Sequence, residues 1–188
     1  MSGAADKANG KIIILSRIFK VSLNRKNNIK QQIIHKKIVE EDLNGLNKPV
    51  AFYHDVMIVD DDEFQLNAII GLLAQAEQCN YIAATNGIIA VDVYKRRIQE
   101  RGIQFSLILM DLRMPFKTGY EASKEIREFE RSENLPRTLI CGISSDKYEG
   151  IEEKCKENGM DNFIFKPVSI HSIRILFEEI KKKEKEQK

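Results

Sequence analysis

Five short apolar runs recur along the chain after residue 50, and each of them stops abruptly at a polar or turn-forming residue. The runs are Val56–Val59, Tyr81–Ala84, Leu107–Met110, Leu139–Ile143 and Phe163–Phe165. A short apolar run without alternating polar positions is typical of a strand that is buried on both faces of a sheet. The sequence therefore predicts a sheet whose two faces are both covered.

Between these runs, apolar residues recur at every third or fourth position, which is the spacing of one face of a helix. The predicted helices span Phe64–Ala76, Ile88–Gln99, 120–134, Tyr148–Asn158 and Ile170–Ile180, and Ser169 is the expected cap of the last one. Strands that alternate with helices predict an α/β fold with a five-stranded parallel doubly wound sheet. This is the flavodoxin-like (βα)5 arrangement, for which we expect the strand order 2-1-3-4-5.

Residues 1–49 show no clear period and end in a cluster of turn-forming residues, Asn44–Pro49. They carry ten Lys or Arg and four Asp or Glu, although the whole chain has a formal net charge of only +2. We therefore expect residues 1–49 to be a basic, flexible leader or linker. Residues 50–188 would then form one domain that ends in a charged tail.

Size and composition limit the class of protein. At 188 residues with 43% hydrophobic and 31% charged residues, the chain has room for one globular domain and an appendage. The apolar run Ile12–Leu15 is far too short for a membrane span. A basic leader on a mildly acidic body does not indicate nucleic-acid binding. The three cysteines show no paired spacing, so we expect a cytoplasmic, reducing environment.

Polar residues of complementary chemistry follow four of the five predicted strands. Asp60 and Asp61 follow the first strand, Asp111 the third, Ser144 the fourth and Lys166 the fifth. Because ligands bind beyond the carboxyl ends of parallel strands, these groups are expected to converge at one edge. Three neighbouring carboxylates repel one another and favour a bound Mg²⁺. Lys166 and Ser144 could then donate to a phosphate, with the solitary Asp111 accepting a phosphoryl group.

Each of these residues has a simpler structural role when it is considered alone. The acidic triplet Asp60–Asp62 could cap the following helix, Asp111 could be a turn residue, and Ser144 could cap a helix. The three histidines lack the pattern of a histidine-kinase phosphoacceptor helix, and the chain contains no Gly-rich ATP-binding motif. The appearance of acid, hydroxyl and ammonium groups at successive strand ends favours a functional site over separate structural roles.

Four segments, VDDDEF, ILMDLRMPFKTGYEA, ISS and NGMDNFIFKP, resemble the receiver domain of two-component response regulators and hybrid histidine kinases. The resemblance spans about Asp55 to Lys183. It implies that Asp111 is the phosphoacceptor and that Mg²⁺ is bound directly by Asp61 and Asp111, through water by Asp60, and by the backbone carbonyl of Arg113. It further implies that Ser144 is the family's hydroxyl residue, Lys166 its lysine and Phe163 its switch aromatic. Pro115 and Gly119 match the turn after the phosphoacceptor.

The expected function is that of a phosphoacceptor signalling module, which is not an enzyme in the ordinary sense. A histidine kinase or histidine phosphotransfer protein would pass a phosphoryl group to Asp111, and a downstream protein would bind the changed surface. Two alternatives remain at this point. One is a degenerate receiver that acts as an unphosphorylated binding module. The other is a phosphatase with an aspartyl nucleophile, which would need a second acid where this chain has Arg113.

Overall fold

All five predicted strands are present, and they run parallel to one another in one sheet. The computed structural model describes residues 36–37, 54–77 and 79–186. The parallel strands are β2 (His54–Val59), β3 (Cys79–Ala84), β4 (Leu107–Asp111), β5 (Leu139–Ser144) and β6 (Asn162–Phe165). Their order across the sheet is β3-β2-β4-β5-β6, which confirms the predicted 2-1-3-4-5 topology.

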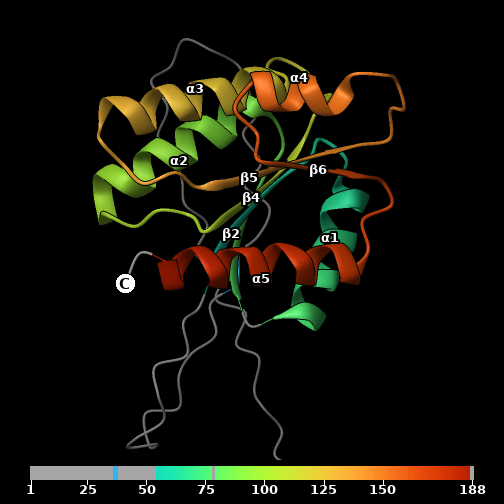
Figure 1. The fold of residues 1–188 in the computed structure, drawn as a ribbon, viewed down its shortest axis with the longest axis horizontal. Helices are drawn as coiled ribbons and strands as arrows, with labels where there is room; N and C mark the ends of the chain where they lie inside the picture. Colours follow the sequence, from blue (N-terminus) through green and yellow to red (C-terminus); the bar gives the residue numbers. More distant parts are fainter. Residues whose placement is uncertain (1–35, 38–53, 78, 187–188) are drawn as a thin grey trace, which may run out of the picture.

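Five helices cover the two faces of this sheet. Their bounds are α1 (Glu63–Ala76), α2 (Gly87–Arg101), α3 (Gly119–Ser132), α4 (Ile151–Glu157) and α5 (Ile170–Glu186). Figure 1 shows α2, α3 and α4 on one side of the sheet and α1 and α5 on the other. No helix in the described ranges is long and apolar enough to cross a membrane.

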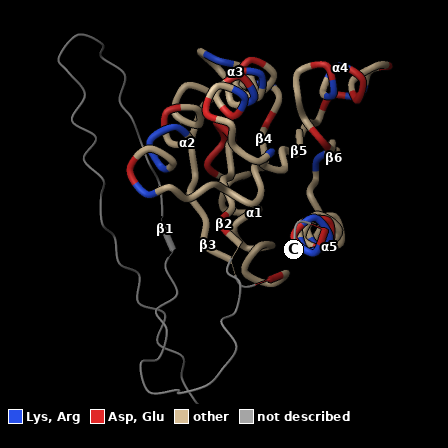
Figure 2. Tube along the Cα trace, turned by 60° about the vertical axis from the view of Figure 1, so that its left-hand side comes forward, with Lys and Arg blue, Asp and Glu red and all other residues tan. Residues whose placement is uncertain are grey.

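The sheet separates two apolar cores, because successive side chains of a strand point to opposite faces. Met57 and Ile108 pack under α2 and α3, whereas Ile58 and Leu109 pack against α1 and α5. All five residues of β4 are buried, which explains why this strand has no alternating polar positions. Figure 2 shows that Lys, Arg, Asp and Glu gather along the helices, whereas the strands carry few of them.

Side-chain caps set the start of several helices at the carboxyl edge of the sheet. The Asp62 carboxylate accepts from the Phe64 N–H at 2.8 Å, so the capping role considered for the acidic triplet belongs to Asp62. Thr118 and Glu121 form a reciprocal capping box at the start of α3. The predicted cap of the last helix is confirmed, since the Ser169 hydroxyl accepts from the Ser172 N–H at 3.1 Å.

Three predicted helix boundaries were wrong. The last helix, predicted over Ile170–Ile180, continues through charged residues to Glu186. The helix predicted over Tyr148–Asn158 begins only at Ile151, because Gly150 adopts a left-handed backbone conformation with φ +84° just before it. The helix predicted to reach Asn134 ends at Ser132, and Asn134 itself has a φ of +51°.

The predicted leader lies almost entirely outside the described residues, as does the expected boundary at Asn44–Pro49. Its described part is β1 (Lys36–Lys37), which pairs antiparallel with β3 at the edge of the sheet. This pairing was not predicted, since residues 1–49 lack the alternation or apolar run that indicates a strand. The division between leader and domain therefore stays a prediction.

Candidate functional site

Parallel pairing brings the four predicted groups to the carboxyl edge of the sheet. Asp60 follows β2, Asp111 is the last residue of β4 and Ser144 is the last residue of β5. Asp111 pairs with Ile143, one residue before Ser144, and the Lys166 N–H donates to the Ser144 carbonyl at 2.8 Å. The backbone ladder itself therefore places these residues side by side.

Lys166, which follows β6, forms ion pairs with two buried carboxylates at the ends of β2 and β4. Its Nζ lies 2.6 Å from Asp111 Oδ1 and 2.7 Å from Asp60 Oδ2. The two aspartate side chains are 7% and 2% exposed, respectively, and the lysine side chain is 13% exposed. The predicted convergence of Asp60, Asp111 and Lys166 thus appears in the structure as direct ion pairs, which are strong in a largely desolvated setting.

Backbone amides hold the remaining carboxylate oxygens in place. Asp111 Oδ2 accepts from the Arg113 N–H at 2.9 Å, and Asp60 Oδ1 accepts from the Asp62 N–H at 3.0 Å. Each carboxylate is therefore fixed by one amide and by Lys166. This leaves lone pairs on all four oxygens, since a carboxylate offers about four acceptor positions.

The charge of this cluster is incompletely compensated. Burial raises the pKa of Asp111 from 3.8 to about 6, with the negative charge of Asp60 adding to the increase and Lys166 opposing it. Burial also works against the ammonium of Lys166, but the two carboxylates outweigh it and raise the lysine pKa. Two buried anions share one cation, so the site favours additional positive charge.

Asp61 differs from the buried Asp60 and Asp111, because it is exposed to solvent. In the described part of the chain, no three His, Cys, Asp or Glu side chains group in a way that could hold a metal by themselves. The donor chemistry nevertheless fits Mg²⁺: Asp60 and Asp111 offer hard oxygen ligands and excess negative charge, and waters usually complete such a site. The roles of Asp61 and the Arg113 carbonyl as ligands stay predictions.

Ser144 is buried and stands beside Lys166. Its hydroxyl oxygen accepts a hydrogen bond from the Asp146 N–H at 3.1 Å, so it also organises the connection between β5 and α4. The side chain of Asp146 in turn forms an ion pair with Arg113 from the β4–α3 connection. This pair could not be predicted from the sequence, since both residues are charged loop positions of a common kind.

Phe163 lies in β6 opposite Gly142 of β5 and is half-buried. Its ring meets that of Phe165 edge-on, with centroids 4.7 Å apart. Phe163 also lines a cavity of about 230 Å³ between α4 and β6, together with Cys155 and Met160. The ring therefore has both a packed side and an adjoining space, and its role in a switch stays a prediction.

Gly119 permits the close approach of α3 to the carboxyl end of β4. A Cβ at this position would lie 2.1 Å from the backbone oxygen of Asp111, which is far below van der Waals contact. The Gly119 N–H also donates to the Leu112 carbonyl at 3.1 Å. The glycine therefore fixes the turn that presents Asp111.

A family model described as the response regulator receiver domain matches residues 56–178. Among curated relatives, the chemotaxis protein CheY of Halobacterium salinarum is 32% identical over 120 residues, which are 63% of this chain and 88% of that protein. The peroxide stress-activated histidine kinase mak1 of Schizosaccharomyces pombe is 28% identical over 121 residues, or 64% of this chain. The aligned part is only 7% of that kinase's own length.

Solved structures show the same relationship. The receiver domain of the Arabidopsis thaliana histidine kinase CKI1, complexed with Mg²⁺ and BeF₃⁻, is 27% identical with a TM-score of 0.60, covering 69% of this chain and 90% of that one. The receiver domain of the response regulator Ssk1, crystallised with the histidine phosphotransfer protein Ypd1 of Saccharomyces cerevisiae, is 26% identical with a TM-score of 0.57, covering 64% and 83%.

Three observations agree on one family. They are the order of the strands, the cluster of acids and lysine at the carboxyl edge of the sheet, and the family match to residues 56–178. This chain belongs to the response regulator receiver domain family.

Proposed function

We propose that this receiver domain accepts a phosphoryl group on Asp111 from a phosphohistidine, carried by a histidine kinase or a histidine phosphotransfer protein. The observation that carries the proposal is the bridge from Lys166 to Asp111 and Asp60, two buried carboxylates at the carboxyl edge of the sheet. A solved relative supports the class of donor, since the Ssk1 receiver domain was crystallised with the phosphotransfer protein Ypd1.

In the proposed step, an oxygen of Asp111 attacks phosphorus and the P–N bond of the phosphohistidine breaks. The bonding electrons pass to the imidazole nitrogen, which takes a proton from solvent. Lys166 and the Ser144 hydroxyl would then donate to the phosphoryl oxygens, because Lys166 already contacts Asp111 and Ser144 follows the residue that pairs with Asp111 in the sheet. Mg²⁺ would be held by the carboxylates of Asp60, Asp61 and Asp111 and by the Arg113 carbonyl, and would neutralise charge on the transferred group.

We further propose that Ser144 and Phe163 report the phosphoryl group to a downstream protein. A charge-assisted hydrogen bond to the new dianion is stronger than the resting bond that the Ser144 hydroxyl accepts from the Asp146 N–H. Movement of Ser144 would release the β5–α4 connection and let the Phe163 ring repack.

Phe163→Ala should leave labelling nearly intact while reducing the phosphorylation-dependent gain in partner affinity. An undiminished gain would exclude Phe163 from the switch.

Two other functions remain testable with the same reagents. A phosphatase with Asp111 as nucleophile would need an acid two residues later, where Arg113 forms an ion pair with Asp146 instead. A degenerate receiver would not use the cluster at all. Incubation with phosphoramidate and Mg²⁺ separates the three functions by product. We expect stoichiometric labelling of the protein, whereas catalytic turnover or no labelling would support one of the alternatives.

A further inference from the structure

One large apolar or aromatic side chain is exposed in, or directly beside, each of the five strand-to-helix connections at the phosphoacceptor edge. These side chains, which we call the collar, are Phe64, Ile88, Phe116, Tyr148 and Phe165. Among the described residues, the other large hydrophobic side chains that are exposed are Ile103 and Ile175. Exposed apolar surface is therefore concentrated at the end of the molecule where Asp111 lies.

Phe116 is the most unusual member of the collar. Its side chain is 75% exposed, and its backbone adopts a left-handed conformation with φ +69°. This conformation is unfavourable for a bulky side chain, whereas Gly and Asn adopt it readily. The exposed ring gains little burial in return, so folding does not explain a phenylalanine here. A bulky side chain at a strained and exposed position, where it adds nothing to folding, points to a functional contact.

The position of Asp111 restricts what can cover the collar. The Asp111 side chain is only 7% exposed, so a donor must project its reactive group into the edge of the sheet. The surface of the donor around that group would then contact the side chains of the collar. Exposed apolar clusters commonly mark protein–protein contacts, and aromatic anchors contribute most of the binding free energy in such contacts.

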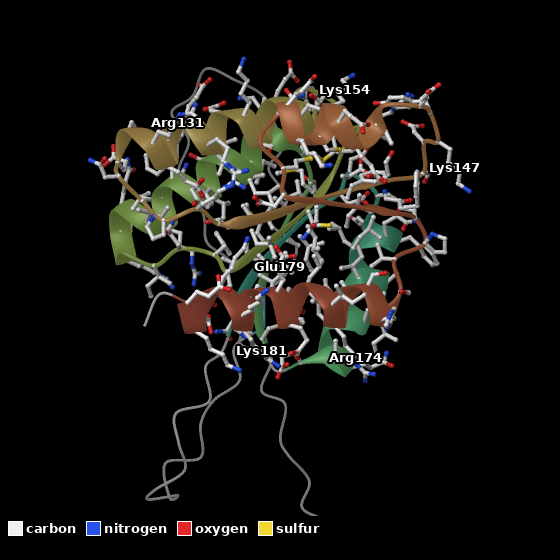
Figure 3. The ribbon with its side chains drawn as sticks, in the orientation of Figure 1. Arg131, Lys147, Lys154, Arg174, Glu179 and Lys181 are labelled. Carbon is white, nitrogen blue, oxygen red and sulfur yellow. The ribbon has the colours of Figure 1, made fainter. Side chains whose placement is uncertain are left out.

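The collar side chains stay exposed although charged groups stand close to them. Lys147 lies over the Phe165 ring at 5.9 Å from its centroid, and Figure 3 shows its side chain extending outward from the β5–α4 connection. Arg113, which is 74% exposed, lies two residues from Pro115 and pairs with Asp146. A docking protein would therefore meet exposed apolar side chains with charged groups of both signs between them, since the exposed acids 61–63 directly precede Phe64.

We infer that Phe116 is the anchor through which this domain docks the protein that carries the phosphohistidine, and that it favours protein donors over small phosphodonors. The inference rests on the proposed function and specifies the partner's chemistry. The partner must present apolar side chains around its histidine, so that they bury the Phe116 ring when the histidine reaches Asp111.

The test compares two P–N phosphodonors with the full chain and Mg²⁺: phosphorylated Ypd1, which has a protein surface, and phosphoramidate, which has none. For the wild-type chain we expect transfer from both. In Phe116→Asn, the ratio of the Ypd1 rate to the phosphoramidate rate should fall roughly tenfold, the loss typical of removing an aromatic anchor. Ile103→Asn is the matched control, because Ile103 is an exposed apolar residue outside the collar. Its ratio should not change.

Urea unfolding identifies any loss that comes from misfolding, and Phe116→Asn should be at least as stable as the wild type because Asn tolerates the backbone conformation. An unchanged ratio in Phe116→Asn, or no transfer from Ypd1 to the wild type, would overturn the inference while leaving the proposed function intact. Absence of phosphoramidate labelling in the wild type would instead contradict the proposed function. A dimer that Phe116→Asn dissociates, with an unchanged ratio, would assign the collar to a second copy of this chain.

Discussion

The domain contains two buried clusters of ionic side chains, one at each end of the sheet, and they differ in their charge balance. At the carboxyl edge, Asp60 and Asp111 share the single ammonium of Lys166. At the opposite edge, Arg127 of α3 lies 2.6 Å from Glu130 and 2.7 Å from Asp161, and Arg137 adds a second cation to Asp161. The first cluster has excess negative charge, whereas the second is neutral.

The two clusters also differ in how fully their oxygens are satisfied. Glu130 accepts from the Tyr94 hydroxyl and from the Thr138 N–H, and Asp161 accepts from the Ile140 N–H as well as from both arginines. Such saturation is what a purely structural buried network requires. The carboxyl-edge cluster keeps free acceptor positions and a raised Asp111 pKa. Incomplete compensation in a buried cluster therefore distinguishes a site for ligands from a structural network.

Removing the buried cation of the neutral cluster, Arg127, should have the largest effect on stability. In Arg127→Met, Glu130 loses its ion pair and Asp161 loses one of two, while both stay largely buried. The free energy of unfolding should fall by about 3–5 kcal/mol, as for other broken buried pairs. Urea denaturation measures this loss of stability, and Arg131→Met is the control. Arg131 is exposed on the same helix, as Figure 3 shows, and its loss should change stability by less than about 0.5 kcal/mol. Equal effects would show that the network is not structural.

The same Asp→Asn substitution should have opposite effects in the two clusters. Asp111→Asn removes uncompensated charge and should raise the free energy of unfolding without metal by about 1–3 kcal/mol near pH 7.5, given an Asp111 pKa of about 6 against 3.8. Asp161→Asn removes the anion that two arginines bind, and this should lower the free energy of unfolding by about 1.5–3 kcal/mol. Shifts of the same sign would contradict the contrast between the clusters.

The pH dependence of the Asp111 effect follows from linkage. Because folding raises the pKa of Asp111, the folded state binds more protons, and stability falls as the pH rises from about 4 to 6. Below that range both states are protonated, so wild type and Asp111→Asn should converge. Above it the difference should be constant. Urea melts across this range measure the difference, and a gap that persists at low pH would show that charge is not its cause.

A smaller effect is expected from the phenol of the neutral cluster. Burial raises the pKa of Tyr94, so its hydroxyl stays protonated and donates to Glu130 at 2.8 Å. Tyr94→Phe should cost about 0.5–1.5 kcal/mol in urea, the usual contribution of one hydrogen bond. Tyr81→Phe is the control, since no hydrogen bond from its hydroxyl to the rest of the described chain is present. A similar loss in both variants would show that the hydrogen bond of the Tyr94 hydroxyl does not stabilise the network.

The carboxyl-edge cluster could be predicted from sequence because each of its residues directly follows an apolar run. Asp60, Asp111, Ser144 and Lys166 stand at strand ends, and parallel strands necessarily bring their ends together. The exposure of Asp61 could not be predicted in the same way. Neighbouring residues of a connection point in different directions, and the sequence does not show which of two adjacent acids turns inward.

The neutral cluster could not be predicted because its members come from separate elements. Arg127 and Glu130 belong to α3 and Asp161 directly precedes β6, and no apolar run or motif in the sequence marks any of the three as buried. Their contacts depend on how α3 sits on the sheet, which spacing along the chain does not specify. The left-handed conformation of Phe116 was missed for a related reason, since a phenylalanine gives no local signal for positive φ.

The location of the phosphoryl group tests the central claim most directly. After incubation with phosphoramidate and Mg²⁺, peptide mapping of the intact chain should find one acid-stable, base-labile phosphoryl group on the peptide that contains Asp111. Asp111→Asn should carry none, although it should fold at least as stably as the wild type. Labelling that persists undiminished in Asp111→Asn, or that maps to another peptide, would contradict the assignment of Asp111 as the phosphoacceptor.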